Sequence, residues 1–272
     1  MFYDYRPMVT LGAVCIMEED GKTENGYAAR AYRRGFDFLS DEVVDVIARE
    51  AVDQTSLLFK AIKPKGGEMP VVMGAGGSGI LLHEAIGHAF EADFNRKNTS
   101  IFSDQLNKKV CNEHINVVDD GTIPFNRGSV NIDDEGVDGQ KTYIVREGVL
   151  TSYLHDRISA KHYGIPSTGN GRRESFRQMP IPRMRATYME AGNVTEEEII
   201  STVKKGIYAA NFTNGQVQIG AGDFTFFVKD GYLIENGKLT QPIKDINIIG
   251  NGPKALADIT MVGNNCLLYT SP

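Results

Sequence analysis

Two histidines and a glutamate lie in the segment with the clearest potential for chemistry, Leu82-His83-Glu84-Ala85-Ile86-Gly87-His88. An imidazole nitrogen is a good zinc ligand, and a glutamate beside a zinc-activated water can serve as the general base. Metallopeptidases usually place their two histidines four residues apart, one turn from each other on a helix. The residue types therefore indicate a hydrolytic zinc site, provided that the backbone brings both rings to one point.

The two histidines are five residues apart, and an ideal α-helix does not bring such positions together. At 3.6 residues per turn, positions i and i+5 are about 140° apart around the helix, against about 40° for i and i+4. Gly87 directly precedes His88, and a π-bulge there would restore the convergence of the rings. Spacing alone leaves two interpretations open, a metal site and a buried helix that happens to carry these residues.

A glycine-rich turn immediately upstream allows a different function. Gly74-x-Gly76-x-x-Gly79 follows a predicted strand and opens a predicted helix, as in a dinucleotide-binding fingerprint. That fingerprint also needs a second strand ending in an acidic residue about 20 positions further on. Residues 94–100 form a polar loop instead, so we expect these glycines to allow close backbone packing between strand and helix, with no nucleotide cofactor.

Weaker candidates lie further along the chain. Residues 170–185 include five arginines, and Asn170, Arg172 and Arg173 are candidates for binding a substrate carboxylate. The acidic pairs at 119–120 and 133–135 lack the spacing of a calcium loop, and we expect solvated turns there. The remaining histidines are expected to be structural or exposed: His114, His155 and His162.

Hydrophobic periodicity predicts an α+β fold, with early helices that include the His-Glu-x-x-x-His helix and a largely antiparallel β region with hairpins after it. Residues 8–17 resemble a buried strand with a hairpin partner at 27–32, and Ser40 or Asp41 can cap a helix that ends near residue 62. Further helices are predicted at 80–93, 156–163 and 195–204. Strands are predicted at 69–73, 142–146, 149–154, 216–219, 224–229 and 232–234, with hairpin turns at Glu147-Gly148 and Asn236-Gly237.

The overall composition narrows the functional class. The chain has 272 residues, 41% hydrophobic and 24% charged, and a formal net charge of -6. This charge argues against nucleic acid as a partner, and no apolar run approaches the roughly 18 residues of a membrane helix. Three widely spaced cysteines, Cys15, Cys111 and Cys266, do not form a disulfide framework, so we expect a reducing compartment.

Several ordered blocks of sequence resemble the TldD/PmbA family over nearly the whole chain, up to about residue 264. They begin with His83-Glu84-x-x-x-His88 and Glu91-x-Asp93-Phe94-Asn95-Arg96-Lys97. They continue with residues 118–122, 131–136, 168–175 and 261–264. The intact His83, Glu84 and His88 are similar to the TldD branch, because PmbA-like partners share the fold and lack the metal ligands.

The resemblance implies a cytoplasmic zinc-dependent peptidase that hydrolyses unfolded or flexible peptides with a zinc-activated water. His83 and His88 would be the zinc ligands and Glu84 the general base. Members of the family work with a PmbA/TldE-like partner subunit as a heterodimer; a homo-oligomer is the other assembly considered. The alternative function is a non-catalytic, PmbA-like partner subunit, which would tolerate Glu84→Gln.

The resemblance also divides the chain into three parts. Residues 1–66 are expected to be the remnant of an N-terminal α/β domain, and residues 67–264 the metallopeptidase C-terminal domain. Residues 265–272 resemble a translated sequencing-adapter end and are expected to be a non-native tail. The family's third zinc ligand is a cysteine beyond the Met261-Val262-Gly263-Asn264 block, a role that we do not assign to Cys266. We therefore expect a fragment with weak zinc binding and impaired activity.

Overall fold

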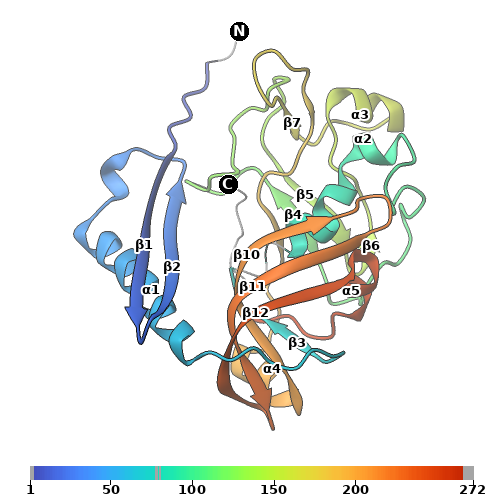
Figure 1. The fold of residues 1–272 in the computed structure, drawn as a ribbon. Helices are drawn as coiled ribbons and strands as arrows, with labels where there is room; N and C mark the ends of the chain where they lie inside the picture. The colour runs from blue at the N-terminus through green and yellow to red at the C-terminus, as the bar shows by residue number, and fades with distance from the viewer. Residues whose placement is uncertain (1–2, 77–78, 80, 266–272) are drawn as a thin grey trace.

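The computed structural model describes residues 3–76, 79 and 81–265 of the chain (Figure 1). The N-terminal part is an antiparallel hairpin of β1 (Val9–Glu19) and β2 (Lys22–Tyr32), followed by the short η1 (Phe36–Phe38) and by α1 (Asp41–Lys60). Asp20 and Gly21 both have positive φ in the connecting turn, which suits the right-handed twist of the strands. The predicted hairpin is confirmed.

Helix α1 covers one face of this hairpin (Figure 1). It begins where the sequence predicts, because the Ser40 side chain accepts a hydrogen bond from the Val43 backbone N–H. Ala28 of β2 packs against Ile47 and Ala51 of the helix. The prediction of a buried strand at residues 8–17 is wrong in one respect, since alternate side chains of β1 face solvent and Ile16 is 70% exposed.

A four-stranded sheet runs in the order β12-β11-β10-β3. Its long meander consists of β10 (Lys205–Val217), β11 (Asp223–Glu235) and β12 (Lys238–Asn251), and β3 (Val71–Met73) pairs with β10 in parallel. The sequence predicts shorter strands here. Register shifts between residues 209 and 214 and between 232 and 234 interrupt the alternation of side chains while the pairing of the backbones continues.

A second sheet has the order β6-β5-β4-β9. It contains β4 (Val117–Asp120), β5 (Lys141–Arg146), β6 (Val149–Leu150) and β9 (Thr187–Met189), all antiparallel to their neighbours. The predicted turn at Glu147 and Gly148 joins β5 to β6, and both residues have positive φ. A separate small ladder pairs β7 (Gly171–Arg172) with β8 (Ile181–Pro182).

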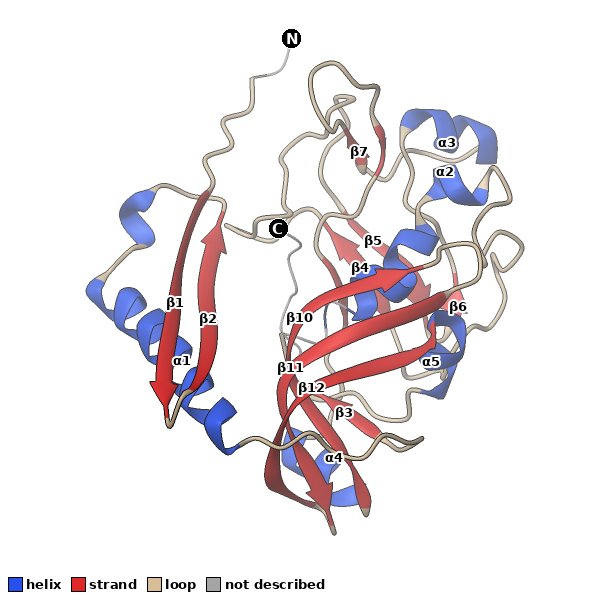
Figure 2. Ribbon diagram, in the orientation of Figure 1, coloured by secondary structure: helices blue, strands red, loops and turns tan. Residues whose placement is uncertain are grey.

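The remaining helices are short and surround these sheets (Figure 2). They are η2 (Leu81–Gly87), η3 (His88–Phe90), α2 (Ala92–Asn95), α3 (Arg157–Tyr163), α4 (Glu196–Thr202) and α5 (Gly252–Asp258). Segment η2 contributes to two apolar clusters: Leu82 and Ile86 pack with Ile144 and its neighbours, whereas Ala85 packs with Phe224 and Phe226. The predicted α+β class is confirmed, and η2 is buried between elements of both sheets.

None of the helices in the described ranges is both long enough and apolar enough to cross a membrane.

Candidate metal centre

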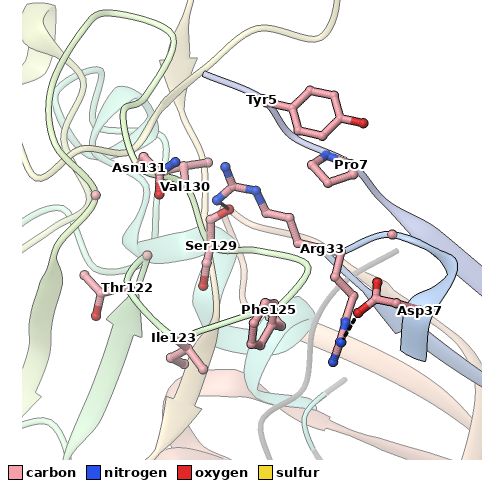
Figure 3. A pocket seen from close by; sticks show the side chains of 14 residues that line it. Tyr5, Pro7, Arg33, Asp37, Thr122, Ile123, Phe125, Ser129, Val130 and Asn131 are labelled. Atoms are coloured by element: carbon pink, nitrogen blue, oxygen red, sulfur yellow. Dashed lines mark hydrogen bonds and ion pairs between the residues drawn. The ribbon is translucent and has the colours of Figure 1, made fainter. Parts of the chain in front are cut away.

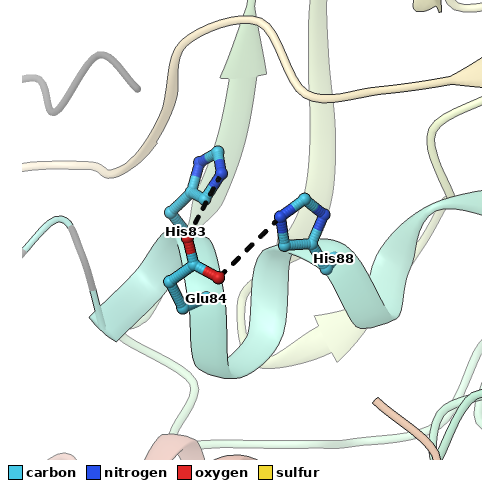
Figure 4. A group of neighbouring side chains, drawn as sticks. All are labelled: His83, Glu84 and His88. Carbon is cyan, nitrogen blue, oxygen red and sulfur yellow. Dashed lines mark ion pairs between the residues drawn. The ribbon is translucent and has the colours of Figure 1, made fainter. Parts of the chain in front are cut away.

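The segment that carries both histidines is wound as a π-helix over Leu81–Gly87. This winding supplies the distortion that the five-residue spacing requires. One donor atom from each of His83, Glu84 and His88 lies within 4.8 Å of the others (Figure 4). The two imidazole rings are edge to face, with centroids 4.8 Å apart. The conditional prediction of a π-bulge is therefore confirmed, and the three side chains converge.

Gly87 lies so close to its neighbours in this winding that an added side chain would collide with them. A Cβ atom there would lie 2.3 Å from Met184 Sδ and 3.0 Å from the carbonyl oxygen of Leu82. The second contact is with the backbone of the same turn, which cannot give way without unwinding it. The glycine before His88 is thus favoured by close packing alone, because its backbone is in the ordinary right-handed helical region, with φ −60° and ψ −50°.

The electrostatics of the cluster suit a cation. Glu84 places one carboxylate oxygen 3.9 Å from His83 Nε2 and the other 3.9 Å from His88 Nε2. Burial, helped by the nearby charges of His88 and Arg172, lowers the pKa of His83 to about 3. His83 is therefore neutral at ordinary pH and keeps a nitrogen lone pair for a metal. Two imidazoles and a carboxylate are donors that zinc accepts, so the residues present fit this ion.

Glu91 lies on the other side of His88 and is a residue to which the sequence assigned no role. Its Oε1 is 3.1 Å from His88 Nδ1, and its Oε2 accepts a hydrogen bond of 2.9 Å from Arg183 Nη1. The spacing of three residues between His88 and Glu91 is the one local signal that could have indicated this contact. Arg183 comes from a distant segment, and no local pattern pairs it with Glu91.

The three candidate substrate-binding residues lie at or beside β7, but in different environments. Asn170 is buried, and its amide donates hydrogen bonds to Asp119 and to the backbone oxygen of Arg183. Arg172 is exposed, and its side chain makes no hydrogen bond or ion pair with any other described residue. Arg173 is exposed and donates to the backbone oxygen of Gln178. Of the three, Arg172 is the one whose charge acts on His83.

The prediction of solvated turns at the two acidic groups is wrong for Asp119 and Asp120, which lie in β4, whereas Asp134 and Glu135 do lie in a turn and are half-buried. Asp119, Asp120 and Asp133 are all buried. Asp119 accepts hydrogen bonds from the Arg185 backbone N–H, although burial raises its pKa to about 6. The donors to Asp119 come from segments remote in sequence, so no local pattern could indicate its burial. Asp120 and Asp133 instead accept hydrogen bonds from backbone N–H groups two to four residues further along, and Asp133 also accepts one from Gly171.

The glycine-rich turn is used for close approach in its described part. Gly74 donates a backbone hydrogen bond to the Ala209 carbonyl, and a Cβ on Gly74 would lie 2.5 Å from Tyr208 Oη. Close packing occurs at this position, but the prediction that the strand approaches the following helix here is wrong, because the neighbour of Gly74 is β10. Residues 77, 78 and 80 lie outside the described residues, as do Cys266 and the rest of the predicted tail.

An α+β domain that presents two histidines and a glutamate to one point is typical of a metal-dependent hydrolase. A family model described as the PmbA/TldA metallopeptidase C-terminal domain matches residues 66–271. The chain belongs to this PmbA/TldD family.

Curated relatives bear the names of the TldD branch. The chain is 44% identical over 267 residues to a metalloprotease TldD homolog of Haemophilus influenzae, covering 96% of this chain and 55% of that protein. It is 35% identical over 208 residues to a zinc metalloprotease TldD homolog of Saccharolobus solfataricus, covering 76% of this chain and 46% of that protein. The chain thus spans about half the length of the curated relatives it matches.

Solved structures share the fold. A crystal structure from Thermotoga maritima superposes with a TM-score of 0.81 at 26% identity, covering 94% of this chain and 57% of that one. TldE from Thermococcus kodakarensis superposes with a TM-score of 0.80 at 22% identity and the same coverage. At 22% identity, the likeness to TldE concerns the fold alone.

Proposed function

We propose that this chain is a zinc-dependent peptidase in which His83 and His88 bind the zinc ion and Glu84 acts as general base. The convergence of three donor atoms within 4.8 Å on one π-helical turn is the observation that carries the proposal. The family membership and the word zinc in the name of one relative support it.

The side chains have separable tasks in peptide hydrolysis. When bound, zinc lowers the pKa of water and polarises a carbonyl oxygen. Glu84, between the two imidazoles and not hydrogen bonded to either, accepts a proton from the attacking water and delivers it to the leaving amine. His83 contributes a neutral nitrogen because its burial disfavours protonation.

The substrates that we propose are unfolded or flexible peptides, bound in extended form. Arg172 and Arg173 are exposed at the β7–β8 ladder and are proposed to contact the peptide. Asn170 is buried, and its amide stabilises the ladder by a hydrogen bond to the Arg183 carbonyl. We propose that residues 67–264 form the metallopeptidase domain, with 1–66 as part of a preceding domain. A PmbA/TldE-like subunit or a second copy is the proposed partner, and the cytoplasm the proposed location.

The second candidate is a non-catalytic partner subunit. The superposition with TldE over 94% of the chain is compatible with it, because the fold alone does not distinguish the two roles. The converging His83, Glu84 and His88 favour catalysis.

Zinc content per purified chain tests the proposal directly. After equilibration with excess zinc, we expect the wild-type chain to hold zinc weakly through its two histidines, His83→Ala to hold none, and His114→Ala, which removes an exposed histidine outside the cluster, to match the wild type. Peptide hydrolysis that is lost with a chelator and restored with zinc would complete the case. A wild-type chain that binds no zinc, or a His83→Ala variant that keeps it, would contradict the site.

A further inference from the structure

The Nδ1 edge of the His88 ring points away from Glu84 and contacts the buried carboxylate of Glu91. Nε2 of His88 lies on the side of Glu84, and Nδ1 is 3.1 Å from Glu91 Oε1. The two nitrogens of one ring therefore meet two different carboxylates. In neutral imidazole one nitrogen carries the proton and the other the lone pair, so the partner of Nδ1 determines which nitrogen can bind a metal.

Glu91 is fully buried and each of its oxygens has its own partner. Its side chain is 0% exposed, Oε1 faces His88, and Oε2 accepts the 2.9 Å hydrogen bond from Arg183. Arg183 is also 3.7 Å from Asp93 Oδ1. A buried carboxylate is costly unless it is paired and hydrogen bonded, and here one oxygen is used for neutralisation and the other is directed at the histidine.

Hydrogen bonds hold the backbone on both sides of Glu91 and so fix the point from which its side chain extends. The Ala92 N–H donates to the Leu154 carbonyl, and the Leu154 N–H donates to the Phe90 carbonyl. The amide of Asn95 donates to the carbonyl oxygens of Ala89 and Glu91, each at 2.8 Å. The turn between η3 and α2 is thus held from two sides, and Glu91 has little freedom to turn away from His88.

Arg183 is fixed in a similar way from the other direction. It follows β8, its backbone N–H donates to the Asn170 carbonyl, and the Asn170 amide donates back to the Arg183 carbonyl at 3.0 Å. The β7–β8 ladder that carries the exposed Arg172 is therefore connected through Arg183 and Glu91 to His88.

We infer that Glu91 and Arg183 are positioning residues for the metal centre. Glu91 accepts the Nδ1–H of His88 and so keeps the lone pair on Nε2, directed toward Glu84 and His83. Arg183 holds Glu91 in the orientation that does this. The positioning role rests on the proposed function, because it presumes that His88 binds a metal. The tautomer of His88 is a property of the metal-free chain and can be measured without any metal.

The tautomer is the first test. Long-range ¹H–¹⁵N NMR of metal-free chain labelled on histidine, recorded at alkaline pH where His88 is neutral, should show His88 with its proton on Nδ1. Glu91→Ala should release this preference, and Glu91→Gln should weaken it, because the amide has one acceptor oxygen for the two donors, His88 Nδ1 and Arg183 Nη1, that the carboxylate accepts from. Asp93→Asn is the matched control, since Asp93 contacts Arg183 but makes no hydrogen bond with His88 among the described residues.

Affinity for a metal is the second test, with Co²⁺ as a spectroscopic probe and thermal unfolding as a check that each variant folds. Groups that hydrogen bond to metal-binding histidines typically contribute about 10–100-fold to metal affinity, so we expect the Kd of Glu91→Ala for Co²⁺ to rise by about this factor. The Kd of Arg183→Gln should lie between those of Glu91→Ala and the wild type, and the Kd of Asp93→Asn should stay within about threefold of the wild-type value.

The outcomes separate the two proposals. An unchanged tautomer and an unchanged Kd in Glu91→Ala would overturn the positioning role, and so would an equal effect of Asp93→Asn. If Glu91→Ala does not fold, Arg183→Gln decides, and a tautomer and a Kd equal to those of the wild type would overturn the role. A wild-type chain with the expected tautomer and no Co²⁺ binding would refute the metal site while leaving the Glu91–His88 contact established.

Discussion

Segment η2 and the β1–β2 hairpin contain similar proportions of apolar residues but are packed in opposite ways. Five of the seven residues of η2 are buried, and its neighbours come from both four-stranded sheets and α5. The hairpin is covered by α1 on one face only, and Val14 and Ile16 on the other face are 65% and 70% exposed.

This difference shows where the molecule can hold side chains in exact positions. A catalytic or metal site needs its groups held to a fraction of an ångström by packing and by hydrogen bonds from further residues. Segment η2 meets that requirement, because five of its seven residues are buried and the His88 that follows it contacts the buried Glu91. The hairpin has a backbone ladder and one packed face, which fix its strands but leave the outer side chains free.

The largest expected contrast between the two regions is in catalysis. Glu84→Gln should reduce peptide hydrolysis by about 10²–10⁴-fold, the usual contribution of a general base, without loss of bound zinc. Glu18→Gln makes the same change at an exposed site on β1 and should leave hydrolysis unchanged. Steady-state cleavage of an unstructured peptide measures both. Equal activity of Glu84→Gln and wild type would show that another group removes the proton.

The same aromatic truncation should separate the two regions in stability. Phe90 follows the two histidines and is 0% exposed, whereas Phe36 beside the hairpin is 76% exposed. Phe90→Ala should lower the free energy of unfolding by about 3–5 kcal/mol, because it leaves a cavity in the largest apolar cluster. Phe36→Ala should change it by less than about 0.5 kcal/mol. Urea unfolding gives both values, and similar losses would mean that η1 is covered in solution.

Alanine substitution at two glycines, one in η2 and one in an open loop, tests the winding of η2. Gly87→Ala should cost about 1–3 kcal/mol, because its Cβ would overlap Met184 and crowd the Leu82 carbonyl. It should also weaken Co²⁺ binding, since relief of the overlap must move His88. Gly66→Ala is the control: no atom lies within 4 Å of its Cβ, and a change below about 1 kcal/mol is expected. Intact metal binding in a destabilised Gly87→Ala would separate the packing role of the glycine from the geometry of the site.

Sequence reasoning succeeded where the determining interaction is local. Ser40 caps α1, and Thr195 forms a capping box at α4, each through atoms three residues away. The turns at Glu147-Gly148 and Asn236-Gly237 were recognisable from residue type alone. The spacing of His83 and His88 even specified the kind of distortion required, because only a wider winding brings positions five residues apart to one side.

It failed where the determining partner is remote. The lengths of β10 and β11 depend on bulges that break the alternation of side chains. The burial of Asp119 depends on Arg185, and the orientation of His88 depends on Arg183, which is 92 residues from Glu91. No local pattern encodes such pairs, so the convergence of His83, Glu84 and His88 could be predicted from the sequence and the residues that hold them could not.

The smallest expected effect is on the outer face of the hairpin. Ile16→Thr replaces one β-branched side chain by another, so the strand propensity of β1 is kept and only apolar surface is removed. Because Ile16 is 70% exposed, the free energy of unfolding should change by less than about 0.5 kcal/mol. The substitution Ile47→Thr, on the buried side of α1, is the counterpart and should cost several times more. A loss of more than about 1 kcal/mol in Ile16→Thr, far above the value for an open surface, would show that this face is covered in solution. Its dependence on protein concentration would then show whether a second copy of the chain covers it.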